Sequence, residues 1–232
     1  MEYKQFAKYY DSFYQKKNYE NEVCFLLNFI EEQDNILDIG CGTGVHASLL
    51  EKEGYRVDGL DLNREMLKIA QTRLHGTLYN QNILDLKIDK KYNLVISMFA
   101  VINHLKNIDE LEKVLFNLKK VLLPNGKIII DLHNPQDSGH KTDSYQNITR
   151  TMIWKLDKEE KIETSDILFE IDGFQYQDSH IFQIFSIEDV QSCCQKVGLQ
   201  IIDIYENYNI DQKGTEHSKN LQFLIKEANF NE

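Results

Sequence analysis

The chain has 232 residues, of which 42% are hydrophobic, and this length and composition suit one globular domain with a full core. Its formal net charge of −11 argues against a protein that binds nucleic acid or anionic lipid over a broad surface. No stretch approaches the ~20 apolar residues that cross a membrane, and residues 1–5 lead into no apolar segment of a secretory signal. We therefore expect a cytoplasmic protein with no membrane or nucleic-acid partner.

Helices and strands are predicted to alternate along the first part of the chain. The first 34 residues are expected to be helical and rich in aromatic side chains. Strands are predicted at residues 35–39, 55–60, 77–80, 92–98 and 127–132, and helices at residues 46–53, 64–74 and 109–122. Asn63 is a suitable N-cap for the second of these helices. This alternation predicts an α/β fold with a doubly wound, mostly parallel sheet, in which ligands bind beyond the carboxyl ends of the strands.

The pattern changes after residue 133. Three alternating strands at residues 149–156, 161–171 and 179–185 predict an antiparallel β insertion rather than a second domain. A capping box of Ser186 and Asp189 opens a helix over residues 187–197. Strands at residues 199–205 and 220–227, joined through a polar loop at 209–218, complete a seven-stranded sheet. We expect a single domain with a helical cover (1–34), a core (35–133), the β insertion (147–185) and a final helix with a hairpin (186–232).

The most informative segment runs from Ile36 to Gly44 with the sequence ILDIGCGTG. A predicted strand ends in a glycine cluster, and a predicted helix follows at once, so backbone N–H groups are free to face a ligand. The spacing is G-x-G-x-G, whereas the dinucleotide fingerprint is G-x-G-x-x-G. This spacing, with Asp38 two residues before Gly40, resembles the first motif of Rossmann-like S-adenosylmethionine (SAM) methyltransferases. The resemblance implies a SAM site, with S-adenosylhomocysteine as product.

The resemblance implies roles for several residues at the ends of the predicted strands. Asp61, with Leu62 beside it, is placed to bind the ribose hydroxyls, although a helix N-cap is an alternative role for its carboxylate. Asp38 is expected to accept from the SAM ammonium or from loop amides. The complete list of expected SAM contacts is Tyr10, Asp38, Gly40, Gly42, Gly44, Asp61, Leu62, Asn82, Ile83 and Met98.

The adenine contact departs from the family pattern. An Asp of the family takes the adenine amino group at the position of Asn82, and the following backbone N–H, here that of Ile83, meets the ring nitrogen. The amide oxygen of Asn82 can still accept one hydrogen bond, and Asp85 is an alternative acceptor. After the fourth strand, Met98 and His104 are expected near the transferable methyl, with Met98 in either a packing or a contact role.

Two residues are candidates for the catalytic role. His104 titrates near neutral pH in its ordinary state, which suits proton acceptance or orientation of a polar acceptor. Tyr14 lies in the segment Tyr10-Asp11-x-x-Tyr14, which resembles the start of small-molecule methyltransferases whose N-terminal helices cover the cofactor. His133, at the end of the fifth strand, is a second histidine candidate. The aromatic residues have a core role as the alternative.

The narrower resemblance is to N-methyltransferases that dimethylate nucleotide-linked amino sugars. It rests on Tyr10-Asp11…Tyr14, on the CGTGVH segment from Cys41 and on the MFAVINHL segment from Met98. It implies methylation of a small-molecule amine. The alternatives are an O-methyltransferase acting on a hydroxyl or carboxyl group and a non-catalytic SAM-binding subunit. The four cysteines form no C-x-x-C pair, so no metal site is expected, and the β insertion makes a homodimer a further expectation.

Overall fold

The computed structural model describes residues 3–14 and 16–228 and contains two β-sheets. The strands of the larger sheet are β1 (Asn35–Ile39), β2 (Arg56–Asp61), β3 (Leu78–Asn80), β4 (Tyr92–Ser97), β5 (Leu122–His133), β10 (Leu199–Glu206), β11 (Asn209–Lys213) and β12 (Asn220–Glu227). Their order is β11-β10-β12-β5-β4-β1-β2-β3. The five neighbouring strands β5, β4, β1, β2 and β3 are parallel. The carboxyl ends of β1, β2, β3 and β4 therefore lie at the same edge of the sheet.

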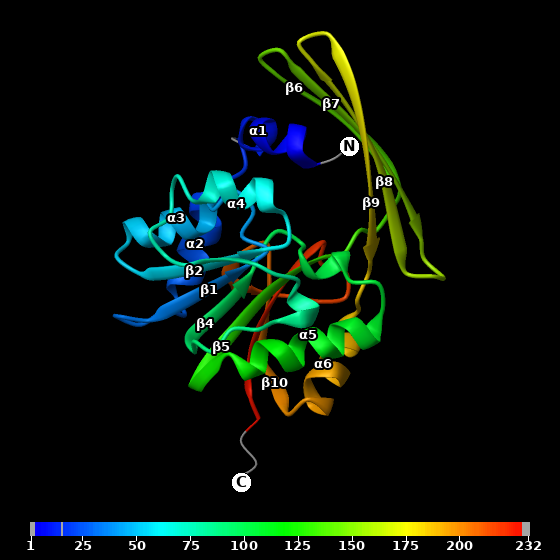
Figure 1. Ribbon diagram of the computed structural model, residues 1–232. Helices are drawn as coiled ribbons and strands as arrows, with labels where there is room; N and C mark the ends of the chain where they lie inside the picture. Colours follow the sequence, from blue (N-terminus) through cyan, green and yellow to red (C-terminus); the bar gives the residue numbers. More distant parts are fainter. Residues whose placement is uncertain (1–2, 15, 229–232) are drawn as a thin grey trace.

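Helices cover both faces of this sheet (Figure 1). They are α1 (Tyr3–Tyr14), α2 (Tyr19–Leu27), α3 (Val45–Lys52), α4 (Arg64–Ala70), α5 (Ile108–Lys120) and α6 (Ile187–Lys196), with short 3-10 helices η1 (Ile83–Asp85) and η2 (Ile102–His104). One buried cluster joins α2, α3 and α4 to the sheet, and another joins α5 and α6 to it. The doubly wound α/β prediction is confirmed. No helix in the described ranges is long and apolar enough to span a membrane.

The smaller sheet stands beside α1 and reaches past it (Figure 1). Its antiparallel strands are β6 (Gly139–Tyr145), β7 (Ile148–Asp157), β8 (Ile162–Ile171) and β9 (Phe174–Gln183). Alternate side chains of β8 are buried, as expected for a sheet with one covered face. The covered face is apolar at Ile167, Phe169 and Ile171, which pack with rings of α1. It is polar at Glu163 and Ser165.

Several predicted boundaries are wrong. The prediction omitted β6, started β9 five residues late and placed β11 in a loop; with β11 the large sheet has eight strands instead of seven. Neither β6 nor β11 has the apolar alternation of a half-buried strand, because both lie at sheet edges and consist almost wholly of polar residues. The predicted helices at 64–74 and 109–122 end earlier, at Ala70 and Lys120. Pro124 lies inside β5, where the pairing register with β4 shifts.

Candidate functional site

The glycine loop after β1 places three residues in the left-handed region, with φ of 69° at Gly40, 56° at Gly42 and 79° at Gly44. A Cβ on Gly40 would lie 2.4 Å from a methyl group of Val101, and one on Gly44 would lie 3.0 Å from Leu74. A Cβ on Gly42 would meet nothing within 4 Å. The first and third glycines therefore allow close packing, while the backbone at Gly42 is open to a ligand.

Two carboxylates lie under this loop. Asp61 Oδ2 accepts from the N–H of Gly42 at 2.8 Å, and its Oδ1 accepts from the N–H of Asn63 at 2.7 Å. Asn63 is the N-cap of α4, so the carboxylate of Asp61 ties the glycine loop to the residue that opens this helix. Asp38 is only 2% exposed, and its Oδ2 has no hydrogen-bond partner among the described residues. Burial and the nearby charge of Asp61 raise the pKa of Asp38 to about 7, although His46 opposes this shift.

The ends of β2 and β3 are tied together by a side chain. Asn80 Nδ2 donates to the carbonyl oxygens of Asp61 at 3.0 Å and Leu62 at 2.9 Å. Leu62 is 68% exposed, which suits an apolar surface for a flat ring. Asn82 Oδ1 accepts from the N–H of Leu84 at 2.9 Å and so caps η1. The oxygen assigned to adenine in the sequence analysis therefore already has a local partner, and Ile83 lies in the same turn.

The turn after β4 has an unusual backbone. Phe99 and Ala100 have φ of 69° and 59°, a region that non-glycine residues adopt at a cost. Buried Asp131 of β5 accepts from both of their N–H groups, each at 2.6 Å, and from the hydroxyl of Tyr208. These donors stabilise the carboxylate, but burial is the larger effect and raises the pKa of Asp131. Met98 just before the turn is buried in the core.

Helix α1 covers the glycine loop. Asp11 accepts from the hydroxyl of Thr43 at 2.6 Å and forms an ion pair with Arg73, which itself donates to the carbonyl of Thr43 at 3.1 Å. The rings of Tyr10 and Tyr14 lie 4.7 Å apart, and Tyr14 meets Phe99 edge-on at 5.0 Å. The structure therefore brings the two predicted tyrosines to the glycine loop and the β4 turn.

A group of charged residues between α1 and α3 was not predicted. Glu22 is buried, lies 2.6 Å from His46 Nε2 and pairs with Lys17. Burial would raise the pKa of Glu22, but the hydrogen bonds from His46 and Lys17 outweigh it and lower that pKa. The ammonium of Lys17 lies 4.6 Å from the ring centre of Phe99 and 4.4 Å from that of Tyr19. The sequence feature that could have pointed to this charged group is Lys17, which follows Tyr14 by three residues.

His104 lies on the other side of the β4 turn, against β9. Its ring centre is 4.8 Å from that of Phe182 and 5.7 Å from that of His180. The residue is exposed to water, yet surrounding protein atoms and His180 lower the pKa of its ring to about 4. At neutral pH His104 is uncharged.

Tyr14 is also a neutral group. Burial raises the pKa of its hydroxyl, against the opposing effect of Arg150, whose guanidinium lies 5.3 Å from the ring centre. A phenol with a raised pKa donates a hydrogen bond and does not accept a proton easily. Tyr14 can therefore orient an acceptor molecule from α1.

His133 ends β5 and faces the smaller sheet. Its Nε2 lies 3.1 Å from Glu163 Oε2, and Ser165 Oγ donates to Glu163 Oε1 at 2.9 Å. Asn103 joins the two sheets at this point: it accepts from the N–H of His133 at 2.9 Å and donates to the carbonyl oxygens of His133 and Gln183. No sequence pattern predicted this side-chain contact between His133 of β5 and Glu163 of β8.

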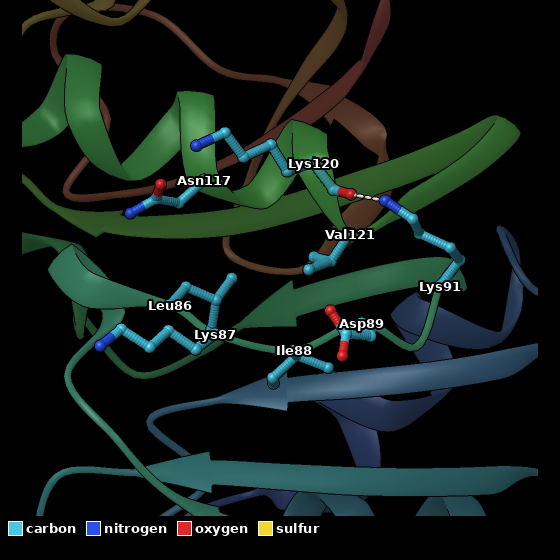
Figure 2. Close-up of a pocket in the computed structure, with 8 residues that line it drawn as sticks. All are labelled: Leu86, Lys87, Ile88, Asp89, Lys91, Asn117, Lys120 and Val121. Carbon is cyan, nitrogen blue, oxygen red and sulfur yellow. Dashed lines mark hydrogen bonds between the residues drawn. The ribbon is translucent and has the colours of Figure 1, made fainter.

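A pocket elsewhere on the surface contains none of these residues. It has a volume of about 590 Å³ and lies between α5 and the segment that leads into β4 (Figure 2). Its lining residues are Leu86, Lys87, Ile88, Asp89, Lys91, Asn117, Lys120 and Val121. Lys91 and Val121 precede β4 and β5, so this pocket is at the opposite end of the strands from the candidate site. The described residues also form no group of three His, Cys, Asp or Glu that could hold a metal ion.

Comparisons with known proteins agree with this geometry. A family model described as a methyltransferase domain matches residues 10–204. A dTDP-3-amino-3,4,6-trideoxy-alpha-D-glucopyranose N,N-dimethyltransferase of Streptomyces venezuelae is 31% identical over 132 residues, which are 54% of this chain and 56% of that protein. The chain thus spans little more than half of the length of this relative.

Solved structures share the whole fold. An S-adenosylmethionine-dependent methyltransferase from Clostridium acetobutylicum superposes with a TM-score of 0.84 at 21% identity, covering 98% of this chain and 99% of that one. SAM-bound CalS10, an amino pentose methyltransferase from Micromonospora echinaspora, has a TM-score of 0.73 at 17% identity and covers 93% of this chain and 95% of that one. Because the family model spans well over half of the sequence, the chain belongs to the methyltransferase-domain family.

Proposed function

We propose that this protein transfers a methyl group from SAM to an amine nitrogen of a small molecule, and that a nucleotide-linked amino sugar is the acceptor class. The amino-sugar N,N-dimethyltransferase from Streptomyces venezuelae is the relative that supports this acceptor. The smaller sheet adds support, because its covered face carries the carboxylate of Glu163 within 3.1 Å of His133 at the end of β5. The negative charge of this carboxylate favours an acceptor that arrives as an ammonium ion.

The residues around the glycine loop fit SAM. Asp38 offers a buried carboxylate oxygen that has no partner in the described part of the chain, which suits the ammonium of the methionine part. The open backbone at Gly42 allows the cofactor to approach closely, and Asp61 lies directly beneath it. Leu62 supplies exposed apolar surface at the end of β2. Bound SAM supplies a methyl group on a positively charged sulfur, so the protein has to position and desolvate the acceptor rather than activate the methyl.

The release of S-adenosylhomocysteine tests this proposal directly. We would incubate the protein with SAM and a panel of nucleotide-linked sugars in which each amino sugar is paired with its hydroxyl analogue. We expect release with the amines alone and mass gains of one or two methyl groups. Turnover with hydroxyl or carboxyl acceptors would instead identify an O-methyltransferase. Bound SAM without turnover on any acceptor would favour a non-catalytic SAM-binding subunit.

A further inference from the structure

We propose that His133, oriented by Glu163, is the group that takes the proton from the acceptor ammonium ion. This inference rests on the proposed function, because an amine acceptor must lose a proton before its nitrogen can attack a methyl group. It assigns a distinct task to a pair of residues that come from different sheets. His104 and Tyr14 then position the acceptor without exchanging protons with it.

The hydrogen bonds around His133 favour one arrangement of its protons. Glu163 is 3% exposed and lies 3.1 Å from His133 Nε2, while its other oxygen accepts from Ser165. A carboxylate only accepts, so the bond requires the hydrogen on Nε2. The second ring nitrogen, Nδ1, therefore carries a lone pair. It has no hydrogen-bond partner among the described residues, and 34% of the side chain is exposed.

The backbone of His133 is held in place from both sides. Asn103 accepts from its N–H and donates to its carbonyl, and the same amide reaches the carbonyl of Gln183 at the end of β9. Since Asn103 also belongs to η2, it links His133 to the turn after β4. The ring therefore stands at a defined place between the cofactor side and the smaller sheet. This is the placement that a proton acceptor needs.

Charge distinguishes His133 from His104. The titratable groups around these rings are Glu163 on β8, Asp178 and His180 on β9, and His104 on η2. His133 has a buried carboxylate in direct contact, which stabilises an imidazolium ion. His104 has Phe182 and His180 as its ring neighbours, and burial together with the charge of His180 lowers the pKa of its ring to about 4. The contact with a buried carboxylate is therefore the feature that sets His133 apart from His104.

The step conserves atoms and charge. One N–H bond of the acceptor ammonium breaks, its proton forms a new bond to His133 Nδ1, and the electron pair stays on the amine nitrogen as the lone pair that attacks. The imidazolium remains paired with Glu163 until its proton passes to water. No oxidant, reductant or metal is required.

Turnover as a function of pH separates this role from a structural one. We would compare Glu163→Gln and His133→Gln with Glu170→Gln, which makes the same change on the exposed face of β8. Near neutral pH we expect turnover to fall about 100-fold in the first two variants. The loss should shrink as the pH rises above the pKa of the acceptor amine, because water then removes the proton. SAM affinity and Glu170→Gln turnover should match the wild type.

The tautomer of His133 gives a readout that needs no turnover. In ¹⁵N-labelled protein saturated with SAM, we expect NMR to show the hydrogen on Nε2 in the wild type and a mixture of tautomers in Glu163→Gln. A hydrogen on Nδ1 in the wild type would overturn the proposal, and so would losses that persist unchanged at high pH. Wild-type turnover restricted to hydroxyl acceptors would overturn the proposed function itself, whereas amine turnover that neither substitution lowers would overturn only the role of His133.

Discussion

Single residues set the charge of the cofactor side, and Asp38 is the one that burial affects most clearly. Its pKa of about 7 means that the carboxylate changes charge within the range in which the protein would work. When SAM is absent, nothing among the described residues offsets the cost of ionising this buried carboxyl group at Oδ2, which has no hydrogen-bond partner there. A bound ammonium removes that cost, so SAM affinity and pH are linked through this residue.

We predict that SAM affinity falls by about tenfold for each pH unit below about 7, because the protonated form of Asp38 cannot pair with a cation. The stability of the SAM-free protein should change in the opposite direction. The folded state holds this proton more tightly than the unfolded state does, so the contribution of Asp38 to stability declines as the pH rises from about 4 to about 7. Calorimetric titrations and thermal unfolding measure the two trends.

Asp38→Asn is the control for this prediction. The amide has nearly the same shape and does not titrate, so both pH dependences should be reduced relative to the wild type. SAM affinity at neutral pH should be about 30-fold weaker, equivalent to the loss of about 2 kcal/mol from a charge-assisted hydrogen bond. A variant with the wild-type pH profile would show that another group titrates in this range.

Sequence patterns predict the cofactor side better than the acceptor side for a physical reason. The glycine loop, Asp38 and Asp61 occupy fixed positions relative to strand ends, so their spacing along the chain carries the information. The contact between His133 and Glu163 joins residues of two separate sheets, and no local pattern encodes their approach. The same is true of buried Glu22 with Lys17, which resembles an ordinary charged pair on a helix surface until the fold is known.

The turn after β4 is under backbone strain. Two successive residues adopt positive φ without being glycine, and Asp131 compensates by accepting from both N–H groups. Tyr208, from the turn between β10 and β11, donates to the same carboxylate. The position of Phe99 and of the following η2 therefore depends on one buried side chain in the neighbouring strand.

We predict that Asp131→Asn lowers stability by about 3 kcal/mol, which corresponds to a Tm lower by about 6–12 °C. The amide keeps one oxygen, but its NH₂ group would face a backbone N–H that also needs an acceptor. Thermal unfolding would measure the change. Tyr208→Phe should cost less, since both backbone bonds persist; an equal loss in the two variants would contradict the role given to the backbone donors.

The contact of α1 with the glycine loop predicts a kinetic effect. Asp11→Ala removes the hydrogen bond to Thr43 and the ion pair with Arg73. Both charged side chains are about one third exposed, so the change in stability should stay below about 1 kcal/mol. SAM dissociation should nevertheless become about fivefold faster in stopped-flow experiments, because the cover over the loop opens more often.

Two variants sharpen the test of this cover. Arg73→Ala should have a similar effect, and combining it with Asp11→Ala should add little, since the two residues share one interaction. Glu20→Ala removes a charge from an exposed position on α2 and should leave the dissociation rate unchanged. Equal acceleration by Glu20→Ala would attribute the effect to general charge.

The elements that the sequence did not predict are those with no buried apolar face. Strands β6 and β11 form sheet edges, and their residues receive their structure from the neighbouring strand rather than from a hydrophobic pattern. In contrast, strands β1 to β4 and α6 with its capping box have local signals and were predicted to within one residue, whereas β5 begins five residues before its predicted start. The doubly wound architecture followed because these local signals agree with one another.

In the whole molecule, the proposed cofactor and acceptor sides are supported by different buried amides. Asn103 connects η2, β5 and the end of β9, and it lies on the acceptor side. Asn117 of α5 donates to the carbonyl oxygens of Ile83 and Leu84, both at 3.0 Å, and supports η1 on the side expected for adenine. Each amide donates two hydrogen bonds to backbone carbonyls, so the two make a matched pair.

We predict that truncating each amide weakens the binding of a different substrate. Asn103→Ala should raise the KM of the acceptor about tenfold and change SAM affinity less than twofold, because it loosens His133 and β9 but not the glycine loop. Asn117→Ala should weaken SAM about tenfold and change the acceptor KM little. Both variants should lose comparable stability. Thermal unfolding measures that loss, so a difference between their binding constants cannot come from a difference in overall stability. Parallel losses in both constants in both variants would show that the two sides act as one unit.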